Sequence, residues 1–148
     1  MTWKRIVCAV DFSEASRTAL RIAAEEAVEA DAELILVYAW VPPVYFVGEM
    51  VGLPAGVLAD LIGTAERELA AWKTEAIGLG AKKVRTELLH GAPWHEIVQY
   101  AKKEAADLIV LGTHGRTGIR HALIGSVAEK VVRHAPCAAP VVPPKHSG

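Results

Sequence analysis

The stretch of sequence that decides the fold is Asp107-Leu108-Ile109-Val110-Leu111-Gly112. Its residues from Asp107 to Leu111 predict a strand buried on both faces, because the apolar side chains run on without polar alternation. Gly112 follows at once, and a glycine-rich segment then leads to Gly125-Ser126. Ligands of open α/β sheets bind beyond the carboxyl ends of the strands. We therefore expect the residues after this strand to carry function.

Strands and helices alternate on either side of this stretch. Ser13 is a suitable N-cap for the first helix, and the pair Gly78 and Gly80 ends the second. This alternation predicts an α/β fold of three layers, with a five-stranded parallel sheet and helices on each face. The predicted strands are Lys4–Val10, Glu33–Ala39, Lys83–Leu89, Asp107–Leu111 and Cys137–Val142, and the predicted helices are Glu14–Ala30, a segment from Pro54 to Gly78, a helix opening at Pro93 and Ser126–His134.

Composition limits the function classes. The chain has 148 residues, 52% of them hydrophobic and 22% charged, with a formal net charge of −1. These values exclude a disordered chain and argue against a general nucleic-acid binder or a polybasic membrane anchor. We expect a single domain over residues 1–148, located in the cytoplasm and not associated with membranes. Cys8 and Cys137 lie far apart in the sequence and fit reduced thiols.

The glycine-rich segment has the parts of a phosphate site. Glycines let backbone N–H groups approach a ligand closely, and a helix that opens at Ser126 offers free N–H groups to an anion. The alternative is a loop whose glycines only serve turns. Both readings stay open on the glycines alone. Gly112 and Gly115 enclose two residues, and nine more residues precede Gly125-Ser126.

This spacing, G-x2-G-x9-G-[ST], resembles that of the ATP-binding branch of the universal stress protein family. Three segments are similar to the family's sequences, namely Ile6-Val7-Cys8-Ala9-Val10-Asp11-Phe12-Ser13, Gly91-Ala92-Pro93 and Ala106-Asp107-Leu108-Ile109-Val110-Leu111-Gly112-Thr113-His114-Gly115. The resemblance spans almost the whole chain. It implies the sheet order 3-2-1-4-5, with ATP bound where the strand order reverses between the first and fourth strands.

The resemblance also implies which residues bind the nucleotide. Adenine is expected near Ala9, Asp11 and Ala39, and ribose near Asp11 and Gly112. The triphosphate, with Mg²⁺ or Mn²⁺, is expected over the glycine motif and the start of the last helix, with Ser126 near the metal ion. The remaining expected binding residues are Thr113, His114, Gly115, Arg116, Gly125, Ser126 and Val127. Trp40 either stacks on adenine or packs at the base of a loop.

The sequence provides little for catalysis. It has neither a G-x4-G-K-[ST] motif nor a G-x-G-x-x-G motif after the first strand, and no residue is an evident base for activating water. We therefore expect an ATP-binding regulatory protein in which any hydrolysis is slow. One alternative is a slow ATPase or an ATP-using transferase that relies on His114, Arg116 and Asp11. Another is an interaction module of the same fold that has lost its ligand.

Two segments are expected to form contacts outside the nucleotide site. The segment 41–57 is unusually apolar, which predicts a lid or a surface for an unknown protein partner, or packing on the second helix. Cys137–Val142 is expected to pair with its copy in a homodimer, as is common in this branch of the family. Pro140 has no N–H group, so we expect it to weaken that pairing or to shift its register.

Overall fold

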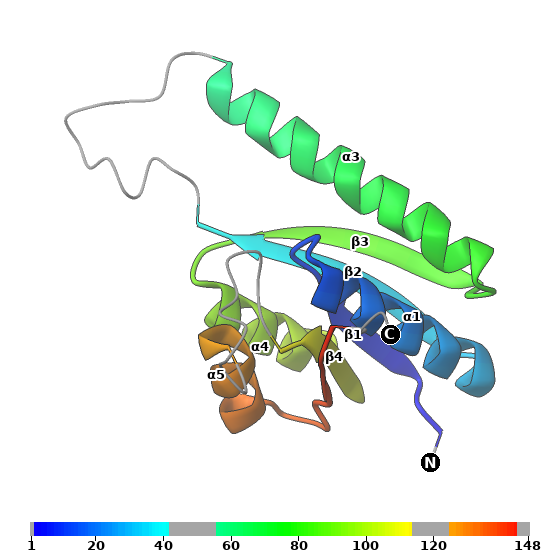
Figure 1. Cartoon of the computed structure of the whole chain (residues 1–148). Coiled ribbons are helices and arrows are strands. Elements are labelled where there is room, and N and C mark those ends of the chain that lie inside the picture. Colours follow the sequence, from blue (N-terminus) through cyan, green and yellow to red (C-terminus); the bar gives the residue numbers. More distant parts are fainter. Residues whose placement is uncertain (1, 42–55, 114–124, 145–148) are drawn as a thin grey trace.

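The computed structural model describes residues 2–41, 56–113 and 125–144 (Figure 1). Five strands alternate with four helices in this part of the chain. In chain order they are β1 (Arg5–Ala9), α1 (Glu14–Ala30), β2 (Glu33–Trp40), α3 (Val57–Gly78), β3 (Lys83–His90), α4 (Pro93–Lys103), β4 (Leu108–Gly112), α5 (Ser126–His134) and β5 (Val141–Val142).

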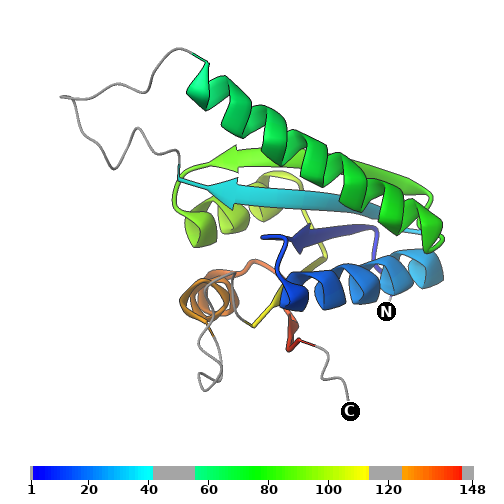
Figure 2. The ribbon, with the colours of Figure 1, turned by 45° about the horizontal axis from the view of Figure 1, so that its top comes forward.

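The strands form one parallel sheet in the order β3-β2-β1-β4-β5, as the sequence predicted. Helices α1 and α3 cover one face, and α4 and α5 cover the other, which confirms the three-layer architecture (Figure 2). The chain passes from the centre of the sheet to one edge, returns, and continues to the other edge. The strand order therefore reverses between β1 and β4, and their carboxyl ends diverge there.

Side chains of the central strands alternate between two apolar cores. Ile6 and Cys8 of β1 pack with α1 and α3, whereas Val7 and Ala9 pack with α4 and α5. Ser13 is the N-cap of α1, and its hydroxyl oxygen accepts a hydrogen bond from the Ser16 N–H at 3.2 Å. The predicted cap is thus confirmed.

Helical spacing alone predicts that Leu61 and Ala105 face the core, but both residues lie outside it. Leu61 of α3 is 38% exposed, because the helix buries only its later residues, beginning at Ala65. Ala105 is exposed because α4 ends before it, and its φ of 53° turns the chain away from the helix. The Ala106 N–H then bonds to the Ala101 carbonyl at 2.9 Å, and Ala106 takes the buried position.

The last strand is shorter than predicted, and Pro140 explains why. The carbonyls of Ala138, Pro140 and Val142 accept hydrogen bonds at 2.9, 3.4 and 2.9 Å from the N–H groups of Ile109, Leu111 and Thr113, respectively. Pro140 therefore faces β4, and its missing N–H interrupts the ladder on that side. Only Val141–Val142 forms a continuous strand, with an isolated bridge at Ala138. The prediction that Pro140 removes a donor from the outer edge was wrong, because that edge carries Ala139 and Val141 instead.

A cluster of charged residues joins the amino ends of the strands. Glu33 of β2 accepts hydrogen bonds from Arg5 of β1 at 2.9 Å and from Arg85 of β3 at 3.1 Å. Arg85 also pairs with Glu104, which follows α4. These contacts lie at the amino ends of the strands. The candidate site lies at the other end of the sheet, at the carboxyl ends of the strands.

Candidate functional site

A cavity of about 250 Å³ opens at the carboxyl ends of β1, β2 and β4, where the strand order reverses. The first turn of α1 and the start of α5 complete its walls. Its lining residues are Ala9, Val10, Asp11, Ser16, Ala39, Pro93, Ile97, Leu111, Gly112, Thr113, Gly125, Ser126, Val127 and Ala128.

One side of this cavity is apolar. Its wall consists of Ala9 and Ala39 at the strand ends, Leu111 of β4, and Pro93 and Ile97 of α4. Small side chains on the two central strands leave room above the sheet. An apolar wall of this kind fits a flat ring, since burial of apolar area stabilises such a ligand.

The backbone of Ala39 adds polar groups to that wall. Val37 faces β1, because its carbonyl accepts the Val10 N–H at 2.8 Å, and the β1–β2 ladder ends with Ala9 opposite Val37. Ala39 lies two residues further along β2, so its N–H and C=O point to the same side as those of Val37. Beyond the end of β1 that side is the cavity, so one donor and one acceptor face a ring bound there.

Asp11 lies in a tightly hydrogen-bonded turn between β1 and α1. Its Oδ1 accepts the Ser13 N–H at 3.0 Å, and its own N–H donates to the Ser16 hydroxyl at 3.3 Å. The Ser16 hydroxyl in turn donates to the Ser13 carbonyl at 3.1 Å. Asp11 therefore stabilises the turn before the helix, while Ser13 is the cap itself. Because Asp11 also lines the cavity, its carboxylate can contact a ligand hydroxyl.

The amino end of α5 forms the opposite, polar side of the cavity. Its N-cap is Gly125, which has no side chain to cap the first turn. Among the residues that the structure describes, the N–H groups of Ser126 and Val127 therefore lack the side-chain acceptor that helix starts commonly have. The Gly125 N–H bonds to the Thr113 carbonyl at 2.5 Å, which fixes this helix end against β4. A helix end of this kind binds anions through its N–H groups and the helix dipole.

Gly112 lets helix α1 lie directly against the end of β4. A Cβ at this position would lie 2.7 Å from the Ala15 Cβ and 3.0 Å from the Ser16 backbone nitrogen. The glycine is therefore needed for the packing that places Ser16 and the Asp11 turn beside β4.

Eight of the eleven residues expected at the site line this one cavity. They are Ala9, Asp11, Ala39, Gly112, Thr113, Gly125, Ser126 and Val127. His114, Gly115 and Arg116 lie outside the described residues, as does most of the apolar segment 41–57.

Several cavity residues were not expected from the sequence. Ser16 is 3% exposed, and the helical spacing to Ala19 and Ala23 already placed it on the buried face of α1. A serine on a buried face needs hydrogen-bond partners, and this was the signal that could have identified it. Pro93 and Ile97 reach the cavity because α4 packs against β2 at this end of the sheet, which no local pattern predicts.

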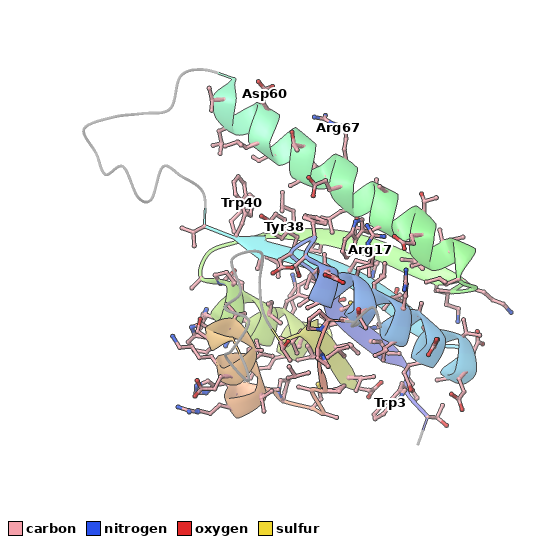
Figure 3. The ribbon with its side chains drawn as sticks, in the orientation of Figure 1. Trp3, Arg17, Tyr38, Trp40, Asp60 and Arg67 are labelled. Atoms are coloured by element: carbon pink, nitrogen blue, oxygen red, sulfur yellow. The ribbon has the colours of Figure 1, made fainter. Side chains whose placement is uncertain are left out.

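Trp40 lies on the face of the sheet opposite to Ala39. Its ring lies 5.8 Å from that of His90, and Figure 3 shows it between β2 and α3. The tryptophan is not among the residues that line the cavity. Packing at the end of β2, and not stacking in the cavity, is therefore its role in this structure.

The two cysteines have suppressed reactivity. Complete burial raises the pKa of the Cys8 thiol to about 12. Burial, together with the nearby Asp107 carboxylate, raises the pKa of Cys137 as well. Both thiols stay protonated at neutral pH, and a thiol is a poor nucleophile compared with a thiolate.

Within residues 2–41, 56–113 and 125–144, no group of three histidine, cysteine or acidic residues is arranged to hold a metal ion.

Comparison with known proteins identifies the family. The model of the universal stress protein family matches residues 2–143. Universal stress protein MJ0531 of Methanocaldococcus jannaschii is 40% identical over 144 residues, which cover 95% of this chain and 82% of that protein. The chain therefore belongs to the universal stress protein family.

Solved structures have the same fold. Hypothetical protein MJ0577, the subject of a structure-based assignment of biochemical function, has a TM-score of 0.85 and 29% identity, covering 99% of this chain and 100% of its own. A universal stress protein of Archaeoglobus fulgidus in complex with dAMP has a TM-score of 0.70 and 28% identity, with 96% and 99% covered. A universal stress protein in complex with cAMP has a TM-score of 0.71 and 25% identity, with 98% and 100% covered.

None of the helices described here has the length and apolar character needed to cross a bilayer.

Proposed function

We propose that this protein binds an adenine nucleotide, ATP in particular, in the cavity between β1 and β4 and acts as a regulatory protein of the stress response. The observation that carries the proposal is the pairing of an apolar wall at Ala39 with the uncapped start of α5 across one cavity. Complexes of family relatives with dAMP and cAMP support it.

The two sides of the cavity suit the two ends of a nucleotide. The purine ring would lie on the wall formed by Ala9, Ala39 and Ile97, with the Ala39 backbone donor and acceptor at its polar edge. Asp11 would accept a hydrogen bond from a ribose hydroxyl. The phosphates would lie at the N–H groups of Ser126 and Val127. The net charge of −1 on the chain does not prevent this, because backbone N–H groups and not cationic side chains would bind the anion.

A divalent cation, Mg²⁺ or Mn²⁺, would enter with the phosphates. Mg²⁺ is commonly held by substrate phosphates and water, with only one or two protein oxygens. The hydroxyl of Ser126, which lines the cavity, is a protein oxygen at that end. This fits a site where the described residues offer no cluster of metal-binding side chains.

The proposed mode of action is a shift between conformations. Nucleotide binding changes the population of two states only if the nucleotide prefers one of them. The residues that reach the cavity come from α1, α4, α5 and three strands, so binding would tie these elements together. Any change would pass to a partner through the protein's surface.

The proposed dimer uses the outer edge of β5. Ala139 and Val141 direct their backbone groups away from β4, because the neighbouring Ala138, Pro140 and Val142 carbonyls bond to β4. An edge strand with outward N–H and C=O groups pairs readily with a second copy. Pro140 faces inward, so it does not remove a donor from this interface.

A thermal-shift panel with ATP, ADP, AMP, cAMP and GTP, each with and without Mg²⁺, tests the proposed function. A ligand at 100 times its Kd adds ~2.7 kcal/mol of stability, or a rise in Tm of roughly 5–10 °C for a chain of this size. We expect the largest rise with Mg-ATP and little with GTP. No rise with any adenine nucleotide at millimolar concentration would refute the proposal.

A further inference from the structure

Phe12 has an unusual backbone conformation for a residue with a large side chain. Its φ is 65°, in the left-handed region that favours glycine. Phe12 stands directly between Asp11, which lines the cavity, and Ser13, which caps α1. Strained backbone of this kind persists only where the surrounding structure holds it in place.

Two aromatic rings hold the Phe12 side chain. Its ring centroid lies 4.9 Å from that of Tyr38 on β2 and 5.2 Å from that of Trp72 on α3, the latter edge to face. Both separations are within the range of favourable aromatic pairs. We call Phe12, Tyr38 and Trp72 the aromatic cluster.

Helix α1 fixes Trp72 from a second side. The Arg17 guanidinium lies 4.7 Å from the centre of the Trp72 ring and pairs with Glu75, one turn further along α3, at 2.5 Å. Figure 3 shows Arg17 and Tyr38 in the region where α1, β2 and α3 meet. The aromatic cluster thus links α3, which contributes no residue to the cavity lining, to the turn that does.

The direction of Asp11 depends on this link. The turn is closed by bonds from the Ser13 N–H to Asp11 Oδ1 and from the Asp11 N–H to the Ser16 hydroxyl. Rotation about the backbone of Phe12, the residue between them, would alter both bonds. If the ring lost its contacts, the strain at this position would favour such a rotation.

We propose that Phe12 is a positioning residue for the nucleotide site, and that the aromatic cluster couples the position of α3 to the orientation of Asp11. The inference rests on the proposed function, since it names a control on the same site. Displacement of α3 by a partner would release Phe12 and lower nucleotide affinity. Nucleotide binding would reciprocally hold α3 in place.

The test compares two substitutions that remove the ring but differ in backbone strain. Phe12→Ala keeps the strain of a positive φ, whereas Phe12→Gly removes it. We expect Mg-ATP affinity, measured by calorimetry, to fall about tenfold in Phe12→Ala and to stay within about threefold of the unchanged protein in Phe12→Gly. If only the packing of the ring mattered, Phe12→Gly would bind Mg-ATP as weakly as Phe12→Ala or more weakly, because glycine is smaller and more flexible than alanine.

Two further variants separate coupling from general loss of stability. Trp72→Leu is expected to lower affinity severalfold in the unchanged background and to have little effect in the Phe12→Gly background. Trp3→Leu is the matched control, because Trp3 also packs on the core of α1 and α3 but bonds to Glu26 and not to the aromatic cluster. It should lower Tm and leave affinity unchanged.

The outcomes distinguish the two proposals. If Phe12→Ala does not fold, as judged by circular dichroism, Phe12→Leu takes its place, because leucine keeps most of the volume and all of the strain. The unchanged protein could bind Mg-ATP while Phe12→Ala (or Phe12→Leu) and Phe12→Gly bind it with equal affinity. That result would overturn this inference alone. Absence of binding by the unchanged protein would overturn the proposed function and this inference with it.

Discussion

At Gly112 the packing of helix α1 leaves no room for a side chain. A methyl group there would lie 2.7 Å from the Ala15 Cβ and 2.9 Å from the Ala15 carbonyl carbon, and neither atom belongs to a flexible side chain that could move aside. The same contact holds Ser16 beside the cavity. One glycine thus serves both the core and the candidate site.

Gly112→Ala is expected to destabilise the protein by ~1–3 kcal/mol, because α1 must shift away from β4. Urea unfolding at neutral pH measures the effect. Gly78→Ala is the matched control, since a Cβ at Gly78 meets nothing within 4 Å. Alanine in that helix should raise stability by up to ~1 kcal/mol. Equal effects of the two substitutions would contradict the packing argument.

The candidate site was predictable at some residues and not at others. Gly125 and Ser126 were found because glycine spacing and a helix start are visible in sequence. Ala9 and Ala39 came only from the family resemblance, since alanine at a strand end has no local signal. Ser16 and Phe12 were missed because their roles depend on which backbone atoms and rings meet in three dimensions.

The charge cluster at the amino ends of the strands gives a pH dependence. The hydrogen bond from Arg85, more than any other contact, holds the pKa of the Glu104 carboxyl below its ordinary value of 4.5. A carboxyl whose pKa is lower in the folded state stabilises the fold above its unfolded pKa. That contribution is lost as pH falls through the folded value.

Arg85→Gln should therefore lower stability at pH 7, and the difference from the unchanged protein should shrink once pH falls below 4.5. Urea unfolding at pH 7 and at acidic pH measures this. Arg133→Gln removes the exposed pair with Glu129 in α5 and serves as the control. Exposed pairs of this kind contribute ~0.3–0.5 kcal/mol, so its effect should be small at both pH values. A constant effect of Arg85→Gln across pH would contradict this reasoning.

The direction in which Pro140 faces decides how the β5 edge is tested. Ala139→Pro removes an outward N–H and is expected to shift the proposed dimer to monomer. Pro140→Ala adds an inward N–H opposite the β4 segment and should leave association unchanged. Sedimentation velocity distinguishes the monomer from the dimer. It is measured at roughly tens of micromolar protein, an ordinary working concentration. A monomeric unchanged protein, or dissociation by Pro140→Ala, would contradict the proposed interface.

The elements themselves were largely visible in the sequence. Strands β1, β2 and β4 were found because burial on both faces requires continuous apolar runs. Ala105, which helical spacing places on the inner face of α4, is exposed because a left-handed turn ends the helix at a residue that carries no glycine signal. The length of β5 was overestimated because the effect of a proline depends on which neighbour its missing N–H would have faced.

Across the whole protein, the two ends of the sheet serve different purposes. The amino ends of the strands are held by Arg5, Glu33 and Arg85, whereas the carboxyl ends open into the cavity. Under the proposed function, any conformational change on nucleotide binding should therefore be confined to the end of the sheet where α1 and α5 begin. The charge cluster fixes the other end.

The most direct test of the central claim is a calorimetric titration with Mg-ATP of the unchanged protein, Ser126→Gln and Ser126→Glu. The two substitutions match in size and differ in charge at the start of α5. A carboxylate there favours the helix but repels phosphate, so Ser126→Glu should fold at least as stably as Ser126→Gln. We predict binding by the unchanged protein and an affinity at least ~100-fold weaker in Ser126→Glu than in Ser126→Gln, because like charges in contact cost several kcal/mol. Equal affinity of the two variants would contradict the placement of the phosphates at this helix end.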